Sequence, residues 1–104
     1  MPHDADSALS RAEEATALLE RARPDSAVRA FGETLAICDQ TPGVVERRIA
    51  PHVRAGRASA LVACGRRLEA IEDFDHVART AEDGALAAQA GRIAALLRAL
   101  DSRD

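Results

Sequence analysis

The chain has 104 residues, 24 of them alanine, and a net charge of −3, which suits one domain with a single modest core. All 14 basic residues are arginine, and the absence of lysine excludes a phosphate-loop lysine and a Schiff-base catalyst. The negative charge and the presence of only two aromatic residues argue against a nucleic-acid partner. The sequence contains no run of about 18 apolar residues, which is the length needed to span a membrane.

Alanine loses least on entering a helix and β-branched runs are nearly absent, so the composition favours an all-α fold. Residues 1–7 are expected to form a flexible N-terminus, with Asp6 or Ser7 as the N-cap of a first helix over residues 8–21. Pro24 suits the first turn of a second helix. Gly32 in the middle of that helix predicts that a neighbouring helix crosses closely there.

A third helix is predicted to begin near Thr41, with Thr41 as its cap and Pro42 in its first turn. Pro51 lies inside a stretch that keeps helical spacing. Either the helix begins only after Ala50, or one long helix bends at the proline. The long helix is favoured because the apolar spacing passes through Pro51 without losing phase.

A fourth helix is predicted over residues 67–81, and a fifth from its cap Asp83 to about Leu100. Their apolar faces are expected to point inward, with Leu68 and Phe74 on the fourth and Leu97 and Leu100 on the fifth. Short turns make successive helices antiparallel neighbours. Residues 8–101 are therefore predicted to form one all-α domain of stacked antiparallel hairpins, followed by a tail at residues 102–104.

The chain repeats itself at an interval of 43 residues. Residues 11–31 and 54–74 carry the same amino acid at eight of their 21 aligned positions, which include the pairs Ala27/Ala70 and Phe31/Phe74. A shorter match, 35 residues further on, relates residues 55–57 to residues 90–92. The sequence therefore predicts two helical hairpins and the first helix of a third.

This unit resembles the tetratricopeptide repeat, a helix–turn–helix that recurs at about 34 residues. Gly65 at the turn, followed by Ala70 and then Phe74 four residues later, is similar to the family's turn and second helix. The chain departs from the family in its longer first interval and in its lack of large aromatic residues on the first helices. The resemblance implies two degenerate repeats and a C-terminal capping helix, arranged as a short α-solenoid that binds a protein and has no chemistry of its own.

The resemblance also implies that the first helices present a concave surface to a partner. The residues expected there are Leu9, Thr16, Leu19, Ser59, Val62 and Leu97. This surface is apolar and lined by small residues, which suits an apolar helix of a protein or peptide partner, or a second copy of the chain. A basic stripe of Arg47, Arg54 and Arg57 is a further candidate contact, unless it pairs with the acidic residues of the fourth helix.

The densest titratable cluster surrounds Asp73, Asp75 and His76 on the fourth helix. A metal site would need a matching ligand from another helix, and no second Glu-x-x-His exists, so a solvated acidic face is the preferred interpretation. Cys38 and Cys64 are expected to be buried structural thiols, although the arginines beside Cys64 could make its thiol slightly acidic. We therefore expect no enzyme activity, no metal and no cofactor.

A patch for self-association is predicted at Val44, Val45, Ile49 and Val53. If the third helix runs on through Pro51, its first two turns extend beyond the hairpins and leave Val44, Val45 and Ile49 without a partner in their own chain. A two-fold homodimer would then bury the same patch on both copies. The alternative is that the segment folds back over the second helix and hides these residues at home.

The start of the sequence lacks the basic and then apolar layout of a signal peptide. Two cysteines without a secretory context are typical of reduced thiols. Both features lead us to expect a cytoplasmic protein.

Overall fold

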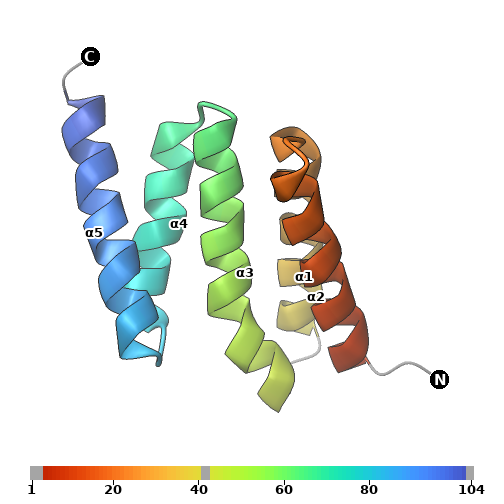
Figure 1. Cartoon of the computed structure of the whole chain (residues 1–104). Coiled ribbons are helices and arrows are strands. Elements are labelled where there is room, and N and C mark those ends of the chain that lie inside the picture. Colours follow the sequence, from red (N-terminus) through yellow and green to blue (C-terminus); the bar gives the residue numbers. More distant parts are fainter. Residues whose placement is uncertain (1–3, 41–42, 103–104) are drawn as a thin grey trace.

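Five α-helices follow the five apolar periodicities of the sequence: α1 (Asp4–Glu20), α2 (Pro24–Gln40), α3 (Val44–Ala63), α4 (Arg67–Thr80) and α5 (Gly84–Asp101). The computed structural model describes residues 4–40 and 43–102, and this part of the chain contains no strand. The helices run alternately up and down, with α3 between the α1–α2 pair on one side and the α4–α5 pair on the other (Figure 1). The predicted all-α fold of stacked antiparallel hairpins is confirmed.

The turns after α1 and α3 have the same backbone structure. Ala22 and Gly65, which are 43 residues apart, both adopt a positive φ, of 60° and 79°. The amides of Ala22 and Arg23 donate to the carbonyls of Leu19 and Leu18, and the amides of Gly65 and Arg66 donate in the same pattern to the carbonyls of Val62 and Leu61. This pattern closes a helix with a left-handed residue. The 43-residue repeat in the sequence is thus a repeat of structure at these turns.

Helix α3 is continuous through Pro51, as the phase of its apolar residues predicted. It begins at Val44 with Gly43 as its N-cap, and the predicted cap Thr41 and Pro42 lie outside the described residues. Its first turns lean away from α4 and reach past the α4–α5 turn (Figure 1). A kink is the usual result of a proline inside a helix, because proline cannot donate a backbone hydrogen bond.

Two other helix ends bear on the predictions. Helix α1 begins at Asp4, so the helix extends further toward the N-terminus than the predicted start at residue 8. Asp83 caps α5 as predicted, and its side chain accepts hydrogen bonds from the amides of Ala85 and Leu86 at 3.0 and 3.2 Å. None of the described helices is long and apolar enough to cross a membrane.

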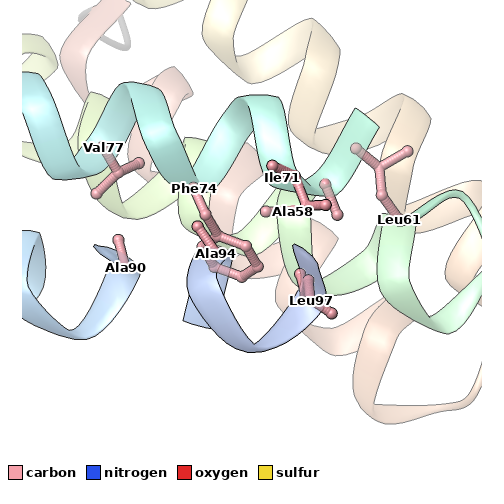
Figure 2. Close-up of a cluster of buried hydrophobic side chains, with 9 residues drawn as sticks. Ala58, Leu61, Ile71, Phe74, Val77, Ala90, Ala94 and Leu97 are labelled. Atoms are coloured by element: carbon pink, nitrogen blue, oxygen red, sulfur yellow. The ribbon is translucent and has the colours of Figure 1, made fainter. Parts of the chain in front are cut away.

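Each phenylalanine anchors one of two core clusters. Phe31 of α2 packs with buried residues of α1 and α3, which include Ala15 and Val53. Phe74 points from α4 toward α5, where it meets Ala94, and it belongs to a cluster that also draws on α3 (Figure 2). That cluster consists of Ala58, Leu61, Ala70, Ile71, Phe74, Val77, Ala90, Ala94 and Leu97. Both phenylalanines are buried, and the prediction that Phe74 faces inward is confirmed.

Two leucines expected inside are exposed. Leu68 is 64% exposed because it lies on the same side of α4 as the exposed Glu72 and Arg79. Leu100, near the end of α5, is also exposed. The buried face of α4 includes Asp73 and not Leu68. The helix is therefore rotated about its axis relative to the orientation that an inward Leu68 would require.

Helices α2 and α3 approach each other closely at Gly56 of α3. The expectation that a neighbouring helix crosses closely at Gly32 was wrong. A β-carbon at Gly56 would lie 2.6 Å from the Phe31 ring. A β-carbon at Gly32 would meet only the Arg57 side chain, at an ordinary distance of 4.0 Å. The aromatic ring of α2 therefore rests on the bare backbone of α3.

Candidate functional site

The acidic cluster on α4 is not one solvated face, because Asp73 is buried in an ion pair with α3. Its residue surface is 6% exposed. Arg57 Nε donates to Asp73 Oδ2 at 2.7 Å and Arg57 Nη2 donates to Oδ1 at 2.8 Å, while Arg54 Nη1 lies 3.5 Å from Oδ1. The hydrogen bond to Asp73 raises the pKa of the Arg57 guanidinium. Asp73 is thus a structural partner of α3.

The other acidic residues of the cluster are paired in different directions. Asp75 accepts a hydrogen bond from Arg98 of α5, and Glu69 accepts two from Arg66, which hold the pKa of the Glu69 carboxyl below its ordinary value. Burial lowers the pKa of His76, and the cations of Arg54 and Arg79 lower it further. No group of three or more His, Cys, Asp or Glu side chains in residues 4–40 and 43–102 could hold a metal ion.

The predicted basic stripe on α3 is divided between two sites. Arg54 and Arg57 are partly buried and form ion pairs with Asp73. Pairing with acidic residues of the fourth helix was the alternative expectation for this stripe. Arg47 is exposed in the first turn of the helix, and its Nε donates to the carbonyl of Gly43 at 3.3 Å. Only Arg47 of the three is therefore directed away from the ion pair.

Arg57 also lines an open cleft of about 240 Å³ between α2, α3 and the start of α4. The lining residues are Val28, Arg57, Leu61, Arg66, Glu69, Glu72 and Asp73. Its charges are largely satisfied internally, since Arg57 binds Asp73 and Arg66 binds Glu69. This cleft therefore offers few free charges to a ligand.

Both cysteines are free thiols in settings that disfavour the thiolate. Cys38 is buried, and burial, together with Glu46 and Asp39, raises its pKa. The thiol of Cys64 donates to Asp25 Oδ1 at 3.1 Å, and its pKa is also raised, chiefly by burial and by this carboxylate. The neighbouring Arg66 lowers the pKa of Cys64 only in part, which speaks against the alternative of a slightly acidic thiol. The expected burial holds for Cys38, whereas Cys64 is only partly buried.

The residues predicted to bind a partner are placed differently from one another. Leu9, Thr16, Ser59 and Val62 are exposed, whereas Leu19 is half-buried and packs on the core beneath α1. Leu97 is buried in the α3–α4–α5 core (Figure 2). The prediction that Leu97 binds a partner was therefore wrong, because Leu97 faces α4.

A groove lies between α3 and α5, and Phe74 of α4 also lines it. Its hollow measures about 100 Å³ and is lined by Ala55, Ser59, Phe74, Leu86, Gln89, Ala90 and Ile93. We call this the α3–α5 groove. Of the residues predicted for a partner surface, Ser59 lies in it and Val62 continues its α3 wall one turn later.

Leu96 and Leu100 continue the α5 wall, because they follow Ile93 by three and seven residues and so share its side of the helix. Leu96 is 64% exposed and Leu100 is 48% exposed. Sequence reasoning missed both as surface residues. The available signal was that α5 carries more leucine and alanine than one buried face can hold.

A second hollow, which we call the lower hollow, separates the first turns of α3 from the α4–α5 turn. It measures about 420 Å³ and is lined by Arg47, Arg48, Pro51, His52, Thr80, Ala81, Glu82, Asp83 and Leu86. A smaller hollow of about 210 Å³ continues it toward Val44 between Arg47, Arg48 and Glu82.

The predicted self-association patch is smaller than expected. Val44 and Val45 are 64% and 40% exposed. Ile49 is half-buried against the Phe31 cluster, and Val53 is a member of that cluster at 2% exposed. The expectation that Ile49 lacks a partner in its own chain was wrong, and so was the place of Val53 in the self-association patch, because α3 lies against α1 and α2 along this side.

Comparisons with known proteins give no relative for this architecture. No protein-family model matches the chain, and neither a curated protein nor a solved structure matches it significantly.

Proposed function

We propose that this chain is a small protein–protein interaction module that holds an apolar helix of its partner in the α3–α5 groove. One observation carries the proposal: large apolar side chains stand exposed on both edges of the groove. They are Val62 on the α3 wall and Leu96 and Leu100 on the α5 wall. Exposed apolar side chains gathered along a hollow are typical of interaction sites.

The energetics favour a helical ligand. Covering the exposed half of one such side chain contributes about 1 kcal/mol before the costs of association. The groove walls are two parallel helices that present residues at helical spacing, and an apolar helix matches this surface through its own residues at the same spacing. Ser59 and Gln89 lie within the groove and provide polar contacts that fix the register.

The chemistry of the rest of the surface supports binding rather than catalysis. The most buried carboxylate on α4, Asp73, is held by Arg57, and the pKa of each cysteine is raised, which disfavours a nucleophilic thiolate. The resemblance to tetratricopeptide repeats agrees with a binding role, and so does the recurrence of the hairpin turn at Ala22 and Gly65.

A site-specific crosslink tests this proposal. A photo-reactive residue at Gln89, inside the groove, should capture a protein partner in cells, whereas the same residue at the exposed Arg29 of α2 should not. The adduct should be lost from chains that also carry Val62→Asp or Leu96→Asp. Leu68→Asp is the matched control, because Leu68 is exposed to the same fraction as Leu96 but lies outside the groove. An adduct that survives the groove variants would reject the α3–α5 groove as the binding site.

A further inference from the structure

The first turns of α3 and the α4–α5 turn form two walls of opposite charge. The α3 wall carries Arg47 and Arg48, and the opposite wall carries Glu82 and Asp83. Within the described part of the chain no ion pair joins these walls, and the side chains of Arg48 and Glu82 make no hydrogen bond. The Asp83 side chain accepts hydrogen bonds from the amides at the start of α5, and the Arg47 side chain donates one to the carbonyl of Gly43. Arg48 and Glu82 are therefore the charges that are free to bind another molecule.

The same region exposes an apolar end and an apolar floor. Val44 is 64% exposed at the end of α3, which reaches past the α4–α5 turn (Figure 1). The lower hollow, at about 420 Å³, is wide enough for such a side chain, and Pro51, Ala81 and Leu86 give it an apolar lining. An exposed apolar projection thus lies beside an apolar hollow on the same molecule.

We propose that the lower hollow and the first turn of α3 form an interface with a second copy of the chain. In a two-fold dimer each contact between two different residues occurs twice. The first residue of one copy contacts the second residue of the other copy, and the symmetry axis repeats this contact with the two copies exchanged. The projecting Val44 of one copy enters the hollow of the other, and Arg48 of each copy faces Glu82 of its partner. The surface is thereby complementary to itself in both shape and charge.

This interface is separate from the proposed partner site. The dimer uses the lower hollow, whereas the proposed partner uses the groove walls around Ser59, Val62 and Leu96, so that either proposal can fail while the other stands. Only Leu86 lines both hollows.

The mass of the purified chain is the first test. Sedimentation of the wild type from low to high micromolar concentration should show a shift from monomer to dimer. Arg48→Glu and Glu82→Arg should each weaken the dimer about tenfold or more, because each places like charges opposite one another twice. Arg29→Glu on the outer side of α2 is the charge-matched control and should leave the dimer intact. Circular dichroism melts confirm that each exposed variant is folded.

Mixing the two single variants is the decisive test. An Arg48→Glu chain paired with a Glu82→Arg chain regains both opposite-charge contacts, so the mixture should dimerise as tightly as the wild type. If the two residues acted only within one chain, mixing would restore nothing. A mixture that stays monomeric, a wild type that is monomeric at high micromolar concentration, or a dimer indifferent to both variants would each overturn the proposal.

Discussion

Arg57 of α3 and Asp73 of α4 are joined by two hydrogen bonds, in which Nε and Nη2 of the guanidinium each donate to a different carboxylate oxygen, at 2.7 and 2.8 Å. The Asp73 side chain is 8% exposed and that of Arg57 28% exposed. Such a two-pronged contact fixes the position of one helix on the other as well as neutralising a buried charge. The pair therefore sets how α3 lies on α4.

We predict that Asp73→Ala lowers the free energy of unfolding by about 2–3 kcal/mol, because it removes the carboxylate that satisfies a partly buried guanidinium. Asp75→Ala is the matched control, since its pair with Arg98 is more exposed and should contribute only about 0.5–1 kcal/mol. Urea denaturation of the two variants measures both values. Equal losses for Asp73 and Asp75 would contradict a structural role for the buried pair.

The helices could be predicted from the sequence because each depends on local periodicity. Proline at the start of α2, Asp83 before α5 and glycine at the turn after α3 are local signals, and all three have the expected structural role. The continuity of α3 through Pro51 followed from the same periodicity. What this reasoning could not provide was the rotation of each helix about its axis, which depends on contacts between helices far apart in sequence.

That rotation explains the errors at the candidate sites. Asp73 and Asp75 are both acidic residues of α4, yet one faces α3 and the other α5. Val53 and Leu97 have the apolar character of a binding surface, but α1 and α2 cover the first and α4 covers the second. The oppositely charged walls of the lower hollow consist of residues about 34 positions apart, and only the packing of α3 beside α4 and α5 brings them together.

Ala22 holds a left-handed conformation that glycine adopts without strain, with a φ of 60°. We predict that Ala22→Gly stabilises the chain by about 0.5–1 kcal/mol, because relief of this strain exceeds the added freedom of the unfolded chain. The reciprocal change, Gly65→Ala, should cost about 1 kcal/mol at the equivalent turn, where a β-carbon would meet no atom within 4 Å. Thermal melts compare the pair, and a loss of stability in Ala22→Gly would contradict the equivalence of the two turns.

His76 should make stability depend on pH. Burial and the nearby Arg54, Arg79 and Arg57 hold its pKa below the ordinary value of 6.5, although Asp73 opposes them. The unfolded chain therefore takes up a proton at a pH where the folded chain does not. The free energy of unfolding should fall as the pH decreases through about 6.5, and it should be level above about pH 7.5.

Urea denaturation between pH 6 and 8 measures this dependence. His76→Gln should flatten it, whereas His52→Gln, which changes the exposed histidine of α3, should leave it in place. If the wild type and His76→Gln have the same slope in this range, the histidine is as accessible to protons in the folded chain as in the unfolded one.

Two glycines in neighbouring helices should respond to alanine in opposite directions. At Gly56 a new β-carbon would lie 2.6 Å from the buried Phe31 ring, so the ring or α3 must shift. We predict that Gly56→Ala lowers the free energy of unfolding by about 1–3 kcal/mol, despite the higher helix propensity of alanine. Gly32→Ala should raise it by about 0.5–1 kcal/mol, because the new methyl group has room and the unfolded chain loses freedom. Chemical denaturation of the two variants measures both changes. If Gly56→Ala is as stabilising as Gly32→Ala, the Phe31 ring does not rest on the backbone of α3, and the packing of α2 on α3 must differ from that described.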